Sequence, residues 1–215
     1  MTYRQIFAAI MFAACLAAAV PAMAIPAEAP TSVTAPVANA ASTVVKNFYA
    51  QLVATMKQGD QLGFSGRFKK LQPAVANAFD MPYMTRVAVG MVWSKATPDE
   101  QQQLISAFSD FSTANYAHNF AKFNGEEFEV VEEKPIKGGV IVETKLTPKD
   151  HDPVVLNYLM HQDSTGTWRI ADVYLDGSIS ELANRRSEFS AIANHDGIPA
   201  LVNSLGTKSK SMGPS

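Results

Sequence analysis

Cysteine is nearly absent from this sequence of 215 residues, since Cys15 is the only one. A single cysteine cannot form a disulfide within the chain, which excludes a small fold that depends on such bonds. Charge of one sign is also scarce, because 18 Lys and Arg face 20 Asp and Glu, for a net charge of −2. A protein with this charge balance has no excess of basic residues to form the positively charged surface that nucleic acids require. We therefore expect no nucleic-acid partner.

Long apolar runs are rare as well, and the clearest one lies near the start. Residues 6–20 are apolar or small, follow the single charge of Arg4, and precede the small-x-small pattern Ala22-Met23-Ala24. This order is typical of a cleaved export signal, and the run is short for a membrane span. We predict a signal peptide over residues 1–24, cleavage after Ala24 and a periplasmic protein. The alternative is a lipoprotein signal cut before Cys15, whose preceding residues match that pattern poorly.

Residues arranged for catalysis are also scarce. The four histidines, at positions 118, 151, 161 and 195, form no helical pair suited to a metal ion. Asp150-His151-Asp152 lies in a predicted turn, where polar residues are expected anyway. Gly63-Phe64-Ser65-Gly66 matches a nucleophile elbow only loosely. We predict no catalytic residue, metal or cofactor. Asp172, within an apolar strand, is the one candidate for an enzyme, and we favour a structural hydrogen-bonding role for it.

Apolar residues recur at helical spacing between residues 42 and 123. Before them, residues 25–41 contain three prolines and no period, which predicts a flexible linker. Residues 42–56 predict one helix, and residues 60–89 predict two or three short helices broken at Gly63, Gly66, Pro73 and Pro82. Thr97-Pro98-Asp99-Glu100 has the residues of a capping box and predicts a helix from there to about Phe123.

The period then changes from helical to alternating. Four apolar runs, at about residues 127–130, 140–146, 154–160 and 168–175, are separated by turn signals, which predicts an antiparallel meander. Ser178 is expected to cap a helix, a last short helix follows, and residues 207–215 are expected to be a disordered tail. The predicted fold is α+β over residues 42–206, with N-terminal helices, a four-stranded antiparallel sheet and C-terminal helices.

Large apolar residues are abundant, with 12 Phe, 9 Met and 6 Tyr. A packed core explains any one of them, but several wide helix faces meeting one sheet favour an apolar cavity between the two layers. Periodicity alone does not separate a packed core from a hollow one. The residues that we predict to line the cavity are Phe48, Leu52, Phe68, Leu71, Met84, Phe108, Phe111, Tyr116 and Phe120 from helices, and Val142, Leu156, Tyr158, Val173 and Leu175 from the sheet.

Several segments, taken in order, resemble one known family. Residues 79–90 resemble its "FD…M…R…LG" helix, residues 93–101 its "W…ATPEQ" segment, residues 168–180 its "W…YDV…GVS" signature, and residues 186–189 and 197–201 its C-terminal helices. The family is that of the MlaC, or toluene-tolerance, periplasmic lipid-binding proteins. The resemblance extends over roughly residues 42–206, and residues 175–189 are most similar to the hopanoid-biosynthesis-associated branch named HpnM.

The resemblance implies a soluble carrier, not an enzyme, that moves a lipid between the inner and outer membranes. The cargo that it implies is a phospholipid, or a hopanoid-type lipid for the HpnM branch. The implied partners are an inner-membrane lipid transporter and an outer-membrane acceptor, and we expect the carrier to be a monomer. Two alternatives remain: an isomerase or hydrolase on a cone-shaped α+β fold, and a structural periplasmic adaptor with a solid core.

Two groups of basic residues are candidates for contact with a partner or a lipid headgroup. The first group is Arg67, Lys69 and Lys70, and the second is Arg185 and Arg186. A solvated helix face is the simpler explanation for either group. We hypothesise that at least one group lies beside the mouth of the cavity, where charges mainly alter association rates and their dependence on salt.

Overall fold

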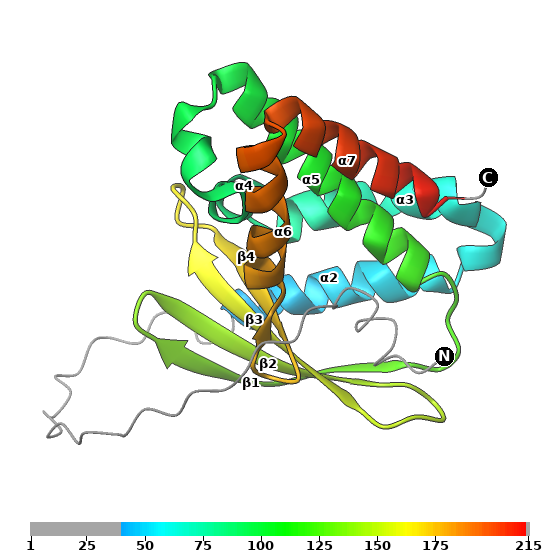
Figure 1. Cartoon of the computed structure of the whole chain (residues 1–215). Helices are drawn as coiled ribbons and strands as arrows, with labels where there is room; N and C mark the ends of the chain where they lie inside the picture. The colour runs from blue at the N-terminus through cyan, green and yellow to red at the C-terminus, as the bar shows by residue number, and fades with distance from the viewer. Residues whose placement is uncertain (1–39, 214–215) are drawn as a thin grey trace, which may run out of the picture.

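The computed structural model describes residues 40–213, where six α-helices lie on one face of a five-stranded sheet (Figure 1). The predicted signal peptide, residues 1–24, and nearly all of the predicted linker, residues 25–41, lie outside the described residues. Among the helices of residues 40–213, none is long and apolar enough to cross a membrane.

The sheet is an antiparallel meander with the strand order β1-β2-β3-β4-β5. Its strands are β1 (Glu127–Ile136), β2 (Gly139–Thr147), β3 (Val154–Gln162), β4 (Trp168–Leu175) and β5 (Ile179–Ser180). The four predicted strands are confirmed, and β5 adds a short fifth one. Val142 pairs with Tyr158 and Thr144 with Leu156, so these four buried side chains share the face beneath the helices.

Helix α2 (Ala40–Met56) begins two residues before the predicted domain, and α3 (Gly59–Ala78) follows it. The predicted break at Gly63 is present as a non-helical residue with φ 59°. The breaks predicted at Gly66 and Pro73 are wrong, because α3 continues through both. Pro73 removes one helical hydrogen bond, but the packing of α3 against α2 and α5 keeps the helix in place.

Helix α4 (Met81–Val89) begins at the predicted break at Pro82, and the carboxylate of Asp80 caps it by accepting from Tyr83 N at 3.0 Å. Helix α5 (Pro98–Asn119) begins at the predicted capping box: Glu100 N donates to Thr97 Oγ1 (3.3 Å), and Thr97 N donates to Glu100 Oε2 (2.8 Å). Helix α5 ends before the predicted end at Phe123. The backbone of Phe120 leaves the helical conformation, and its ring packs in the core.

Helix α6 (Glu181–His195) is capped by Ser180, which accepts from Ala183 N at 2.8 Å. The prediction that Ser178 caps this helix is wrong, because the chain first forms β5 against β4. Helix α7 (Ile198–Ser211) extends into the predicted disordered tail, so that prediction is wrong for residues 207–211. Burial of Leu201 and Leu205, on a helix that packs along α5, stabilises this C-terminal segment.

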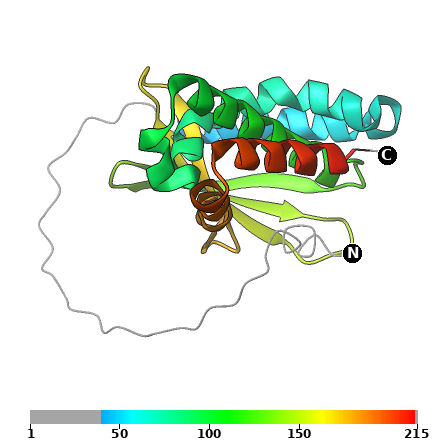
Figure 2. The same cartoon turned by 45° about the horizontal axis from the view of Figure 1, so that its top comes forward.

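The helices are arranged in two tiers over the sheet. Helix α2 packs directly on β1, β2 and β4, and α3, α5 and α7 pack beyond it, while α4 and α6 lie near β4 (Figures 1 and 2). Between α2 and the sheet, the hydroxyl of Tyr49 forms hydrogen bonds with Thr144 Oγ1 (2.7 Å) and Tyr158 Oη (3.0 Å). This arrangement fills the space above the middle strands, while α4 and α6 join α2 in covering β4.

Candidate functional site

An apolar pocket, here called the β4 pocket, lies between β4 and helices α4, α5 and α6. Its volume is about 100 Å³. Ligand pockets usually measure about 300–1,000 Å³, so this pocket holds only a short stretch of an acyl chain unless it widens. The residues that line it are Phe79, Met84, Phe108, Phe111, Ser112, Asn115, Tyr116, Asn119, Phe120, Val173, Glu181, Leu182 and Arg185.

Helix α5 supplies the largest wall of the β4 pocket. Phe108, Phe111, Asn115 and Asn119 recur at intervals of three or four residues, which places them along one face of the helix. Aromatic rings form the apolar part of that wall: the ring of Phe108 meets Phe189 edge-on at 5.0 Å, and Tyr116 stacks on Phe120 at 5.9 Å between centroids. These contacts hold the aromatic wall in a defined arrangement.

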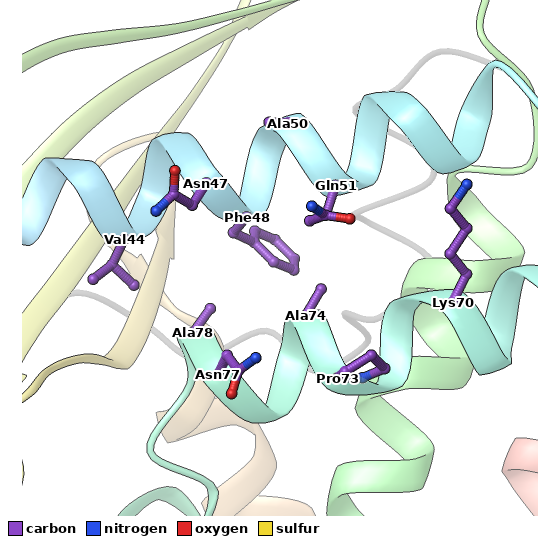
Figure 3. Close-up of a pocket in the computed structure, with 10 residues that line it drawn as sticks. All are labelled: Val44, Asn47, Phe48, Ala50, Gln51, Lys70, Pro73, Ala74, Asn77 and Ala78. Carbon is purple, nitrogen blue, oxygen red and sulfur yellow. The ribbon is translucent and has the colours of Figure 1, made fainter.

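A second hollow, the α2–α3 groove, lies between those two helices. Figure 3 shows the ring of Phe48 pointing from α2 into the space beside Ala74 of α3. The groove measures about 540 Å³ and is lined by Val44, Asn47, Phe48, Ala50, Gln51, Lys70, Pro73, Ala74, Asn77 and Ala78. It is larger than the β4 pocket but more polar, since three amides and a lysine contribute to its wall.

Three aromatic rings separate the two hollows. Phe48, which lines the groove, meets Phe79 edge-on at 5.2 Å and Tyr116 edge-on at 5.0 Å. Both of these partners line the β4 pocket. We call Phe48, Phe79 and Tyr116 the aromatic partition.

Two charged residues stand out in the mostly apolar wall of the β4 pocket. Arg185 is 13% exposed, places its guanidinium 5.0 Å from the Phe111 ring centroid, and donates to Glu188 Oε2 at 3.3 Å. Burial raises the pKa of the Glu181 carboxyl above its usual value, and nearby Arg185 opposes part of that rise. Glu181 Oε1 is buried and has no hydrogen-bond partner within residues 40–213.

The predicted cavity residues divide into several environments. Those in the β4 pocket are Met84, Phe108, Phe111, Tyr116, Phe120 and Val173. Phe48 lines the α2–α3 groove, and Phe68 lines a third hollow between α3, α5 and α7. The remaining predicted residues are buried and line none of these three hollows: Leu52, Leu71, Val142, Leu156, Tyr158 and Leu175. The structure therefore brings together one subset of the predicted wall.

The two basic groups are dispersed. Arg67 connects α3 with the end of α5, because its Nε donates to Ala117 O (2.8 Å) and its Nη1 to Gly59 O (2.9 Å). Lys69 lines the third hollow, and Lys70 lines the α2–α3 groove and donates to Gln58 Oε1 at 3.0 Å. Arg185 lines the β4 pocket, whereas Arg186 is exposed on the surface of α6.

The structural role that we favoured for Asp172 is confirmed. Its carboxylate accepts hydrogen bonds from Val173 N (2.7 Å), Leu182 N (3.0 Å) and Ser180 Oγ (2.5 Å). Burial raises the pKa of Asp172, and these hydrogen bonds oppose the rise. These hydrogen bonds connect the start of α6 to β4. Asp172 does not line the β4 pocket.

The three residues of Asp150-His151-Asp152 are exposed in the turn before β3. Throughout residues 40–213, no three His, Cys, Asp or Glu side chains gather where they could hold a metal ion.

The sequence prediction missed part of the β4 pocket: Phe79, Ser112, Asn115, Asn119, Glu181 and Leu182. Ser112, Asn115 and Asn119 lie on the same face of α5 as Phe108 and Phe111, so a helical-wheel projection of this segment could have identified them. Glu181 carries no such signal, because acidic residues are common in the first turn of any helix.

Two comparisons with known proteins agree with this architecture. The family model described as MlaC protein matches residues 46–207. Among solved structures, the chain is similar to a phospholipid-binding protein from Ralstonia solanacearum, in complex with a phospholipid. The TM-score is 0.69 and the identity 22%, over 80% of this chain and 98% of that chain. At this identity, the likeness establishes a shared fold.

Proposed function

Since this chain belongs to the MlaC family, we propose that it is a periplasmic lipid carrier that shuttles a phospholipid or a hopanoid-type lipid between the inner and outer membranes. The β4 pocket is the main support for lipid binding, because its wall is mainly apolar with a few polar groups. The phospholipid held by the structural relative makes a phospholipid the first choice of cargo. The likeness of residues 175–189 to the HpnM branch makes a hopanoid the second.

The energetics of a free lipid explain why a carrier needs such a pocket. Each buried methylene is worth about 0.8 kcal/mol, so an acyl chain of ~16 carbons costs roughly 12 kcal/mol in water. An apolar pocket that admits the chain removes most of this cost. Such a carrier needs shape and apolar surface, and it needs no catalytic group.

The tail requires more room than the β4 pocket offers at about 100 Å³. We propose that the tail enters beside Val173 and Met84 and displaces the aromatic partition. Rotation of Phe48 then gives the end of the tail access to the α2–α3 groove, which adds about 540 Å³. Aromatic side chains suit this role, because a rotation about two bonds moves a large apolar surface.

Delivery requires docking on partners. We propose that the carrier works as a monomer that collects lipid from, or delivers it to, an inner-membrane transporter, with an outer-membrane acceptor at the other end. Lys69, Lys70 and Arg186 are candidates for this contact. Arg185, in the wall of the β4 pocket, is better placed for the lipid itself.

Two matched substitutions test where the lipid binds. Val173 and Val44 are both half-buried valines, but Val173 lines the β4 pocket and Val44 lines the α2–α3 groove. After exposure of each protein to phospholipid vesicles, native mass spectrometry measures bound lipid. We expect Val173→Trp to lose lipid of any tail length. We expect Val44→Trp to keep short-tailed lipid and lose long-tailed lipid, because only the end of the tail reaches the groove.

Wild-type protein that neither co-purifies with lipid nor takes it up from vesicles would contradict the carrier function. Lipid retained by a folded Val173→Trp variant would show instead that the β4 pocket is not the binding site. Circular dichroism of each variant distinguishes a blocked pocket from an unfolded protein.

A further inference from the structure

Glu181 is unusual among the buried carboxylates of this protein. Asp172, its neighbour across the start of α6, accepts three hydrogen bonds. Glu181 is half-buried as a residue, but its Oε1 atom is buried and accepts none within residues 40–213. A buried acceptor without a partner is energetically costly and rare in native proteins. Its position in the wall of the β4 pocket suggests that a bound molecule supplies the missing donor.

The donors nearest to Glu181 in the chain already have other partners. The hydroxyl of Ser180 and the backbone N–H of Leu182 both donate to Asp172, and the N–H of Ala183 donates to Ser180 Oγ. Arg185, one helical turn further on, directs its guanidinium to Glu188 and to the face of Phe111. A donor for Glu181 Oε1 must therefore come from elsewhere, such as a molecule bound in the β4 pocket.

Arg185 supplies the complementary charge. It lines the same pocket as Glu181, four residues away on the same face of α6. Its acidic partner Glu188 is also bound by Lys208, so the negative charge of Glu188 is shared between two cations. Arg185 thus retains attraction for a phosphate oxygen, while Glu181 attracts a hydrogen-bond donor.

We propose that Glu181 and Arg185 form a headgroup site that selects lipids whose polar end carries N–H or O–H donors. This inference rests on the proposed function and specifies its cargo. The donors are either the ammonium of a phosphoethanolamine headgroup, whose phosphate then faces Arg185, or the hydroxyls of a hopanoid polyol. Glu181 accepts from the donor in both cases.

Phosphatidylethanolamine and phosphatidylcholine provide a matched pair of probes. Both headgroups are zwitterionic, but methyl groups replace all N–H donors in phosphatidylcholine. A hydrogen bond to a buried carboxylate therefore distinguishes them where charge alone does not. From vesicles containing equal amounts of the two lipids with identical tails, we expect wild-type protein to take phosphatidylethanolamine in about tenfold excess.

The test uses native mass spectrometry of full-length variants after exposure to these mixed vesicles. Glu181→Leu removes the acceptor at similar size and should bind the two lipids equally, because phosphatidylethanolamine loses its hydrogen bond. Glu181→Gln keeps one acceptor oxygen and should retain part of the preference. Glu129→Leu, at an exposed position of β1, is the control and should behave as wild type. The same measurement with a second pair of lipids, a hopanoid polyol and a hopanoid hydrocarbon without hydroxyls, shows whether the protein prefers hopanoid hydroxyls or the phosphoethanolamine ammonium as the donor.

A thermal melt separates a binding role from a structural one. Because Glu181 Oε1 lacks a partner within the described chain, Glu181→Leu should melt at or above the wild-type temperature. Equal uptake of donor-bearing and donor-free lipids by wild type would overturn the inference, and so would a preference that survives in Glu181→Leu. Absence of any lipid from wild type would contradict the carrier function itself.

Discussion

Tyr49 shows how a single residue connects helix α2 to the sheet. Its hydroxyl bonds to Thr144 and Tyr158, and Thr144 in turn donates to Leu156 O at 2.5 Å. Burial raises the pKa of Tyr49 to about 12, although its two hydrogen bonds lower it in part. Burial raises the pKa of Tyr158 as well. The sheet is thereby anchored to α2 by neutral phenols.

This anchor predicts a loss of stability at alkaline pH. The pKa of Tyr49 is higher in the folded than in the unfolded chain, where it is about 10. Its contribution is therefore fully present below pH ~10 and is lost as the pH rises towards about 12. Urea unfolding of wild type should give a constant free energy of unfolding from pH 8 to 10 and a declining one above.

Tyr49→Phe should be less stable by about 1–2 kcal/mol at pH 8, because Thr144 and Tyr158 lose a partner. Its decline above pH 10 should be shallower than that of wild type. Tyr174→Phe, at a half-buried position of β4, is the control and should lose less stability. An unchanged free energy of unfolding in Tyr49→Phe would contradict the anchoring role.

At the same scale, the sequence identified some wall residues and missed others for a physical reason. Helical spacing places Phe108, Phe111 and Tyr116 of α5 towards the core, and all three line the β4 pocket. Alternation in the strands places Val142 and Tyr158 on the correct face, yet both are packed in the core. Alternation of apolar and polar residues along a strand indicates which face of the strand is buried. It does not reveal which part of that face a helix fills.

At the scale of whole elements, the start of α6 depends on Asp172. The carboxylate receives donors from β4, from β5 and from the first turn of α6. Because α6 carries Glu181, Leu182 and Arg185 into the β4 pocket, this connection positions one wall of the site. Asp172 therefore acts on the pocket through the placement of a helix.

Asp172→Ala should lower the free energy of unfolding by about 3 kcal/mol, because it leaves three donors, all buried or partly buried, without an acceptor. Asp172→Asn keeps an acceptor oxygen and should lose less. Asp152→Ala, in the exposed turn before β3, is the control and should change stability little. Chemical denaturation gives these values. A wild-type stability in Asp172→Ala would contradict the fastening role.

Among the elements, those with strong local signals were predicted well. The capping box at Thr97 and the alternating strands depend on neighbouring residues, so the sequence reveals them directly. The continuity of α3 through Pro73 and the length of α7 depend on packing against other helices. Tertiary contacts override local propensity at such positions, and a single sequence does not display those contacts.

At the scale of the whole molecule, the exposed basic residues predict salt-dependent transfer. Lys69 and Lys70 lie on α3 at the margins of two different hollows, outside the β4 pocket. The double variant Lys69→Glu/Lys70→Glu should slow lipid transfer to or from the membrane partner, most clearly at low salt, because opposite charge weakens the attraction during association. Stopped-flow measurement of transfer rates at several salt concentrations checks this.

Short-tailed lipid, which does not reach the α2–α3 groove that Lys70 lines, should bind to that double variant as to wild type, which separates docking from binding. Arg185→Glu/Arg186→Glu should differ, since Arg185 lines the β4 pocket and its reversal should also reduce lipid occupancy. Wild-type transfer rates at low salt in both double variants would exclude the two basic groups from docking.

Occupation of the space between β4 and the helices by a lipid tail is tested most directly with a phosphatidylethanolamine that carries a photoreactive diazirine on its tail. Mass spectrometry after irradiation maps the adduct. We predict adducts on the peptides that contain Met84, Phe108, Phe111 and Val173, and on Phe48 when the diazirine lies near the tail end. Adducts confined to the third hollow between α3, α5 and α7, or to the exposed surface, would contradict the account.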